Sequence, residues 1–226
     1  MERSSVSRGT LRFEGSEVGA LTDLGRILDT GLVALDLELG STQRDQLLDL
    51  ALLLGRWNER INLSGHRGAS DLMARSILES LALAKELPRV DSIVDLGSGA
   101  GVPGLPIAIL RPDAQVLLVE AREKRHHFQR AAIRSLHTNN VRALRGRIEE
   151  LEAEPARLAI AQAVVPPRRM LPSMLPWVSS GGFTVIPGSE VPPDPGAHAE
   201  ILDVEVRHYC APASGAARTL WIGRRR

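Results

Sequence analysis

The chain has 226 residues, of which 43% are hydrophobic and 24% are charged, with 20 Gly and 14 Pro. These proportions are typical of a globular protein, and they exclude collagen-like, disordered and disulfide-rich small scaffolds. The 28 Lys and Arg residues nearly balance 27 Asp and Glu, and there are only three Phe, three Trp and one Tyr. Few aromatic rings argue against a base-stacking RNA module, and a net charge of +1 does not indicate nucleic-acid binding.

The N-terminal ninety residues are predicted to be helical. Residues 1–15 are polar and are expected to form a flexible arm. Between residues 18 and 39 the apolar side chains recur every three or four positions, which predicts a helix. Ser41 or Thr42 is expected to cap a second helix, and Ser70 a third that ends before Pro88. We therefore assign residues 16–90 to an N-terminal helical region.

From residue 91 the pattern changes to strands that alternate with helices. Strands are predicted over 92–96, 116–120, 141–144, 158–165 and 182–186, with helices over 103–110 and 123–136. This alternation predicts a parallel sheet with right-handed crossovers. The last two strands, 200–209 and 218–223, are too close in sequence for a crossover, so they suit an antiparallel hairpin. Residues 91–226 thus match the α/β, Rossmann-like, seven-stranded plan of class I methyltransferases.

A glycine-rich turn, Asp95-Leu-Gly-Ser-Gly-Ala-Gly-Val-Pro-Gly104, follows the first strand, where doubly wound sheets bind ligands. Glycines 97, 99 and 101 let the backbone turn sharply and approach a ligand closely. Val102 replaces the last glycine of the dinucleotide fingerprint, so the NAD pattern fails. The alternative reading is a tight strand-to-helix connection without a ligand.

Glu120 ends the second strand, where a carboxylate can accept hydrogen bonds from ribose hydroxyls. No Gly-Lys-Ser phosphate-binding pattern accompanies the turn. A nucleoside without phosphates is therefore favoured, and S-adenosylmethionine fits. The alternative for Glu120 is a solvated carboxylate at the end of a strand.

Four segments together resemble the GidB/RsmG family of bacterial 16S ribosomal RNA guanine-N7 methyltransferases. They are Arg56-Trp-Asn-Glu-Arg-Ile-Asn-Leu-Ser64, Arg75-Ser-Ile-Leu-Glu-Ser-Leu81, the turn from Asp95 to Pro106, and Gly146-Arg-Ile-Glu-Glu-Leu151. They follow the family's order and spacing from about residue 45 to 190. The resemblance implies the cofactor S-adenosylmethionine and a ribosomal RNA substrate.

The resemblance also implies site residues. Gly97 and Val102 take positions at which the family contacts the cofactor, and Ile148 and Glu149 take positions at which it holds the adenine. Gln162 stands where the family has a cofactor-site Arg, and Ser76 where it has a His. With the turn and Glu120, the cofactor-binding residues are expected to be Gly97, Ser98, Gly99, Gly101, Val102, Glu120, Ile148, Glu149 and Gln162.

Elimination of other methylation chemistries favours guanine N7, which has a lone pair and no proton to remove. The loop of amino-methylating enzymes is absent, because Val165-Pro-Pro-Arg168 has neither its amide nor its aromatic residue. Carbon-5 methylation of cytosine needs a thiolate, and Cys210 lies far from that loop in sequence. Oxygen acceptors on small molecules stay open, and no catalytic residue is assigned.

A local basic stretch gives the RNA signal that the net charge hides. Residues 122–147 hold eight Lys or Arg and one acid, Glu123, a surface suited to phosphates. We expect RNA contacts from Arg122, Lys124, Arg125, Arg168 and Arg169. A solvated basic face is the alternative.

The single cysteine excludes an internal disulfide, no Cys and His cluster has zinc spacing, and no signal peptide or membrane span is seen. We therefore expect a cytoplasmic, metal-free monomer that acts on 16S ribosomal RNA or the 30S subunit. Two alternatives stay open: a divergent family member that methylates another substrate such as a small molecule, and a non-catalytic module that binds RNA or the cofactor.

Overall fold

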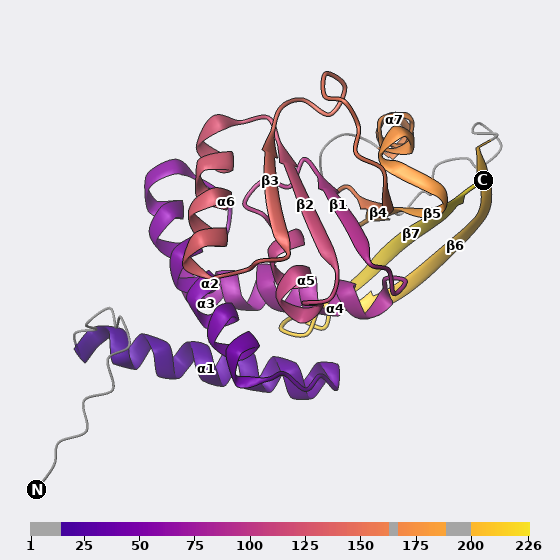
Figure 1. Ribbon diagram of the computed structural model, residues 1–226. Helices are drawn as coiled ribbons and strands as arrows, with labels where there is room; N and C mark the ends of the chain where they lie inside the picture. Colours follow the sequence, from indigo (N-terminus) through magenta and orange to yellow (C-terminus); the bar gives the residue numbers. More distant parts are fainter. Residues whose placement is uncertain (1–14, 163–166, 189–199) are drawn as a thin grey trace, which may run out of the picture.

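The computed structural model describes residues 15–162, 167–188 and 200–226. Its N-terminal part is helical, as predicted, with no strand in residues 15–90. The elements there are α1 (Gly15–Leu35), α2 (Ser41–Ile61), α3 (Gly68–Leu72), the π-helix η1 (Met73–Ile77) and α4 (Leu78–Glu86). In Figure 1, α1 lies across one end of the molecule, outside the other helices.

The predicted helix caps are wrong. The N-cap of α2 is Gly40, whose N–H donates to Oε1 of Gln43 at 3.0 Å. The N-cap of α3 is Arg67, whose N–H donates to Oδ2 of Asp71 at 3.2 Å, so Ser70 lies inside the helix. In both helices a side chain of the first turn accepts a hydrogen bond from the N–H of the N-cap residue, which is one of the two bonds of a capping box.

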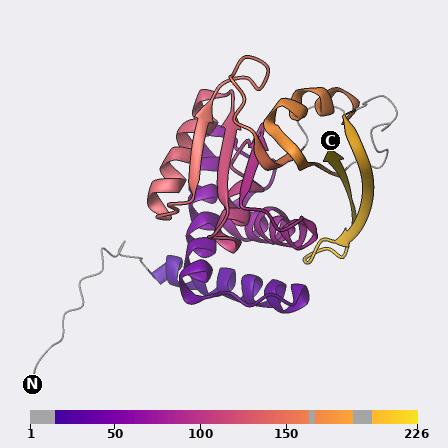
Figure 2. The ribbon, with the colours of Figure 1, turned by 45° about the vertical axis from the view of Figure 1, so that its right-hand side comes forward.

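The sheet has seven strands in the order β3-β2-β1-β4-β5-β7-β6. The strands are β1 (Ser92–Leu96), β2 (Gln115–Glu120), β3 (Val141–Arg145), β4 (Ala156–Ile160), β5 (Val178–Pro187), β6 (Ile201–Cys210) and β7 (Ala217–Arg225). The first five pair in parallel, and β6 and β7 form the predicted antiparallel hairpin at one edge. Figure 2 shows this hairpin on the side of the molecule opposite β3. The predicted class I methyltransferase architecture is confirmed.

The crossovers contain α5 (Gly104–Leu110), α6 (Glu123–Ser135), α7 (Pro167–Met174) and a short 3-10 helix, η2 (Leu175–Trp177). The fourth strand was predicted over residues 158–165. In the structure it begins earlier, at Ala156, and ends earlier, at Ile160. Its start is fixed where N–H of Arg157 donates to Oγ of Ser92 in the neighbouring strand. Residues 163–166 and most of the link between β5 and β6 lie outside the described residues.

The two faces of the sheet bury different halves of each strand, because successive side chains point to opposite faces. Ile93, Val116, Leu118 and Leu158 face the core that includes the N-terminal helices, α5 and α6. Val94, Leu117, Val119 and Ala159 face a second core, which is covered by α7 and the segment after β3. The predicted boundary near residue 90 stays a prediction, and the larger core runs across it, joining Leu28 and Leu54 to Leu118 and Phe128.

Candidate functional site

The glycine-rich turn is fastened to the end of β2. N–H of Gly97 and N–H of Ser98 both donate to the carbonyl of Val119, at 2.9 and 3.0 Å. Gly97, Gly99 and Gly101 have φ values of 71°, 57° and 71°. Residues other than glycine rarely adopt this left-handed backbone conformation, so the three glycines are needed for the shape of the turn.

Glu120 binds the turn directly. Its Oε2 accepts a hydrogen bond from N–H of Gly99 at 2.9 Å, and its Oε1 accepts one from N–H of Arg122 at 2.7 Å. Nη1 of Arg125 lies 4.0 Å from Oε2. The carboxylate is 5% exposed, so these donors replace the water that an ionised acid would otherwise bind. Glu120 therefore anchors the turn, which excludes the reading of a solvated carboxylate.

Asp95 holds the other end of the turn. Its Oδ2 accepts a hydrogen bond from N–H of Gly104 at 2.9 Å, and the residue is 1% exposed. Burial raises the pKa of this carboxyl to about 7, the bond from Gly104 opposes the rise, and the nearby charge of Glu120 adds to it. A Cβ atom at position 104 would lie 2.3 Å from Cδ2 of Leu118 and 2.9 Å from Oδ2 of Asp95, so the start of α5 also requires glycine.

Gln129 supports the turn from α6, and the sequence analysis missed it. It is fully buried, and its Nε2 donates to Oγ of Ser98 at 2.8 Å and to the carbonyl of Gly99 at 2.9 Å. Its Oε1 is buried without a hydrogen-bond partner. The sequence does contain a signal for this role, because Gln129 is an amide on the apolar side of α6, next to Phe128 and three positions before Ala132.

A cavity of about 350 Å³ lies between the glycine-rich turn and the helical region. We call it the central cavity. The turn, α6, the end of β4 and the hairpin contribute Gly97, Ser98, Gly99, Ala100, Val102, Arg125, Gln162 and Tyr209. The helical region contributes Leu54, Leu63, Ser64, His66, Leu72, Arg75, Ser76, Glu79, Ser80 and Leu83. Its walls thus come from segments that are far apart in the sequence.

The helical wall is built around the π-helix, which places Arg75 and Ser76 at the cavity one turn before Glu79. Such π-turns within helices frequently occur at functional sites. The carboxylate of Glu79 forms a bidentate pair with the guanidinium of Arg218 in β7, with Nη2 at 3.0 Å from Oε1 and Nε at 3.3 Å from Oε2. This pair joins the helical region to the hairpin. Beside it, burial and then the charge of Glu79 raise the pKa of Tyr209 to about 12.

The predicted cofactor residues occupy two kinds of position. Gly97, Ser98, Gly99, Val102 and Gln162 line the central cavity, and Gly101 belongs to the same turn. Ile148 instead packs against the second core, after β3. Glu149 is exposed, and its Oε1 accepts a hydrogen bond from Oγ of Ser173 at 3.4 Å. The roles assigned to Ile148 and Glu149 stay predictions.

Comparison with known proteins identifies the family. The model of the GidB family, rRNA small subunit methyltransferase G, matches residues 43–192. The chain belongs to this family. Proteins named ribosomal RNA small subunit methyltransferase G are similar over most of their length. The one from Alteromonas mediterranea is 35% identical over 74% of this chain and 79% of its own. The one from Chromohalobacter salexigens is 31% identical over 85% of this chain and 93% of its own.

Solved structures share the fold of this GidB family member. The crystal structure of M. jannaschii TYW2 in complex with AdoMet has a TM-score of 0.53 at 18% identity, over 66% of this chain and 74% of that one. A geranyl diphosphate methyltransferase in complex with SAM has a TM-score of 0.51 at 13% identity, over 66% of this chain and 85% of that one. Both were solved with AdoMet (SAM) bound, and the likeness in fold agrees with the class I architecture.

The two departures from the family pattern both lie at the central cavity. Gln162 is exposed there, just after β4, and Ser76 lies on the π-helix. Neither side chain forms a hydrogen bond with another part of the described chain. The amide and the hydroxyl therefore both leave the cavity wall uncharged at positions where the family pattern has Arg and His.

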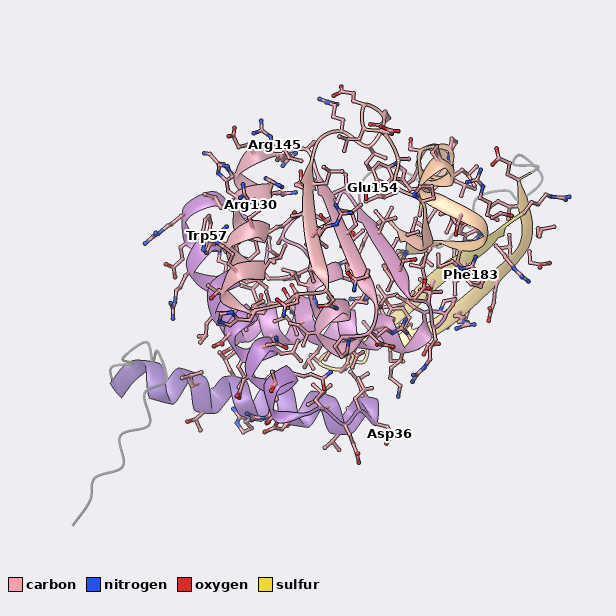
Figure 3. The ribbon with its side chains drawn as sticks, in the orientation of Figure 1. Asp36, Trp57, Arg130, Arg145, Glu154 and Phe183 are labelled. Atoms are coloured by element: carbon pink, nitrogen blue, oxygen red, sulfur yellow. The ribbon has the colours of Figure 1, made fainter. Side chains whose placement is uncertain are left out.

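The basic stretch is less positive than its sequence suggests. Arg142 pairs with Glu154, Arg145 with Glu123 at 3.2 Å, and Arg147 with Glu150 at 3.7 Å. Figure 3 shows Arg145 and Arg130 on the α6 side of the sheet. Of the predicted RNA-binding residues, Arg122 and Lys124 are exposed and Arg125 is half-buried at the central cavity. Arg168 and Arg169 lie in the first turn of α7, and their side chains are outside the described part of the chain.

Two further searches covered the residues that the structure describes. No described helix is long and apolar enough to cross a membrane. No group of three or more His, Cys, Asp or Glu side chains that could hold a metal ion occurs among these residues.

Proposed function

We propose that this protein uses S-adenosylmethionine to methylate N7 of a guanine in 16S ribosomal RNA. The observation that carries the proposal is the central cavity, in which the glycine-rich turn faces the helical wall. Its volume of about 350 Å³ falls in the range of small-molecule sites. The membership of the chain in the rRNA small subunit methyltransferase G family supports the choice of substrate.

The residues present fit S-adenosylmethionine. The left-handed Gly97 and Gly99 bring backbone to the cavity without side chains, and buried Glu120 supplies a carboxylate beside Gly99. Glu120 itself is not among the described lining of the central cavity. We propose that ribose hydroxyls bind beside Gly99, at the carboxylate lone pairs that the N–H groups of Gly99 and Arg122 leave unused. When bound, the cofactor would supply an electrophilic methyl group, and its sulfur would keep the electron pair of the broken carbon–sulfur bond as a neutral thioether. The protein has to align the acceptor with this group and exclude water.

The ionisable side chains around the cavity suit an acceptor that has no proton to lose. Glu79 is paired with Arg218, and Nδ1 of His66 lies 3.5 Å from Asp71. Tyr209, with a pKa of about 12, stays protonated at neutral pH and is a poor base. An oxygen acceptor would need a base to remove its proton, whereas the lone pair of guanine N7 attacks directly. Glu79 and Tyr209 are thus poor bases, which suits guanine N7, whereas His66 beside Asp71 is the group that would serve a hydroxyl acceptor in the alternative small-molecule reaction.

Mass analysis of nucleosides from 16S ribosomal RNA tests the proposal. A strain without the gene is expected to lose one N7-methylguanosine per 16S molecule, and the wild-type gene should restore it. An unchanged level would overturn the proposed activity. Methyl transfer to metabolites but not to 30S subunits or 16S RNA would identify a small-molecule enzyme. No binding of S-adenosylmethionine in calorimetry would identify a non-catalytic module. The proposal also places the protein in the cytoplasm, with ribosomal RNA.

A further inference from the structure

A second hollow lies beside the central cavity, between the end of α2, the loop that follows it and the start of α6. Its volume is about 890 Å³, and we call it the loop hollow. The end of α2 contributes Asn58 and Arg60, the loop contributes Gly65 and Arg67, and α6 contributes Lys124. The end of α2 and its following loop, together with the start of the distant α6, therefore bring three cations to one depression.

The three cations of the loop hollow are available for a ligand. Arg60, Arg67 and Lys124 are exposed, and none of the three side chains forms an ion pair within the described residues. Glu59 is the one acid in the described lining, so the lining has an excess of positive charge. This contrasts with Arg145 further along the basic stretch, which is paired with an acid. The hollow therefore attracts anions.

The loop that carries Arg67 is held in one conformation. Oδ1 of Asn58 accepts a hydrogen bond from N–H of Ser64 at 2.7 Å, and Nδ2 of Asn58 donates to the carbonyl of His66 at 2.7 Å. Asn62 ends α2 with a left-handed φ of 51°. Because these bonds fix the backbone before any ligand arrives, binding costs little conformational entropy there.

The loop hollow and the central cavity share a wall. Ser64 lines both, His66 lines the central cavity, and Arg67 lines the loop hollow. At the start of α6, Lys124 lines the loop hollow, whereas the next residue, Arg125, lines the central cavity. A nucleic-acid strand with one base in the central cavity therefore has its neighbouring backbone beside the loop hollow.

We propose that the loop hollow binds the backbone phosphates of the RNA strand that flanks the methylated guanine, through Arg60, Arg67 and Lys124. This assignment rests on the proposed function and adds Arg60 and Arg67 to the predicted RNA contacts. No described residue of the lining is aromatic, so recognition there uses charge rather than base stacking. Phosphate contacts position the strand and leave the choice of base to the central cavity.

The test is the salt dependence of RNA binding by a triple variant, Arg60→Ala, Arg67→Ala and Lys124→Ala, measured with 30S subunits and with naked 16S RNA. The slope of log K against log salt concentration is negative, and each lost phosphate contact should reduce its magnitude by about 0.7 to 0.9. The three single variants should each give about a third of the change. Binding of S-adenosylmethionine, measured by calorimetry, should stay at the wild-type level and shows that the fold is intact.

The matched control removes three exposed arginines outside both the loop hollow and the basic stretch, Arg89→Ala, Arg224→Ala and Arg226→Ala, and should keep the wild-type slope. A wild-type slope in the triple variant, or an equal loss in the control, overturns the phosphate assignment. If the slope is reduced with 30S subunits but not with naked 16S RNA, the loop hollow contacts a ribosomal protein. That result also overturns the phosphate assignment. If the wild-type protein binds neither form of RNA, the proposed function itself fails, which is a distinct result.

Discussion

At the scale of single residues, the buried carboxyl of Asp95 links stability to pH. Its pKa of about 7 lies above the value of 3.8 expected in the unfolded chain. Between about pH 4 and pH 7 the native state therefore binds more protons than the unfolded state. The free energy of unfolding should therefore fall as pH rises through this window, and Asp95 contributes no further slope above it.

Asp95→Asn should flatten this part of the pH profile, because the amide oxygen can still accept the bond from N–H of Gly104 while no proton is bound. Urea unfolding at several pH values between 4 and 8 measures the effect. Asp91→Asn, an exposed acid just before β1, is the control and should keep the wild-type slope. An identical slope in the Asp95 variant would show that another group causes the pH dependence.

Glu120 gives the second prediction at this scale. Glu120→Gln keeps the shape of the side chain but replaces the charged acceptor proposed for the ribose hydroxyls, which also accepts the Gly99 N–H, with a neutral one. Since hydrogen bonds to charged groups contribute about 1.5–3 kcal/mol, S-adenosylmethionine should bind about 10- to 100-fold more weakly. Calorimetry provides the measurement. Glu123→Gln, an exposed acid on α6, should bind like the wild type, and wild-type affinity in the Glu120 variant would remove this residue from the site.

At the scale of elements, the pair between Glu79 and Arg218 connects α4 with the hairpin. The two side chains are 22% and 35% exposed, so water screens the interaction in part. We expect Arg218→Ala to lower the free energy of unfolding by about 1–2 kcal/mol, since it leaves a half-buried carboxylate without its partner. Arg224→Ala, on the same strand and exposed, should change stability by less than about 0.5 kcal/mol.

A double-mutant cycle with Glu79→Gln isolates the pair itself. The double variant should be no less stable than Arg218→Ala alone, because the Gln side chain does not leave a buried charge. Purely additive losses would mean that the two residues stabilise the fold independently of one another.

The elements were predictable where local patterns decide them. Short apolar runs gave β1 and β2, and the glycines after β1 gave the turn, because both signals lie within a few neighbouring residues. The helix caps were not predictable, because Gly40 and Arg67 take the N-cap positions and Gln43 and Asp71 accept the hydrogen bonds from their N–H groups. Ser and Thr near a helix start are acceptable caps, and the sequence does not show which acceptor reaches the backbone.

The helical wall of the candidate site could not be predicted without the tertiary structure. The wall with Glu79 faces the turn only because the helical region packs on the sheet, and the partner of Glu79 lies 139 residues away. The pairing of Arg142 with Glu154 likewise depends on the course of the segment after β3. Charge counted along the sequence overstated the basic stretch for this reason. Gln129 had a local signal, a polar residue on an apolar helix face, that was not used.

At the scale of the whole molecule, one core joins the helical region to the sheet. Leu28 and Leu54 pack in the same cluster as Leu118 and Phe128, and Trp57 contacts Phe128 edge to face with ring centroids 5.6 Å apart. Figure 3 shows Trp57 where α2 lies beside α6. We therefore expect the helices and the sheet to unfold in a single transition in calorimetry. Two separate transitions would contradict this and would support independent domains on either side of residue 90.

Because one core joins the two parts, binding of S-adenosylmethionine should stabilise the helical region and the sheet together. Because the central cavity is lined by both parts, S-adenosylmethionine at 100 times its Kd should stabilise the whole protein by about 2.7 kcal/mol. Denaturant unfolding followed by circular dichroism and by tryptophan fluorescence should show the same shift. A shift seen by one probe only would contradict this expectation.

The long separation between Glu79 and Arg218 also bears on the order of folding. Contacts between distant positions form after the intervening chain has been arranged, because closing a long loop costs entropy before the contact can compensate for it. The glycine-rich turn and β2 are close in sequence and can associate early. The wall that faces them is joined to the hairpin only when positions 79 and 218 meet. We therefore expect the cavity to be completed late in folding, so that early intermediates carry the turn but lack a closed binding site.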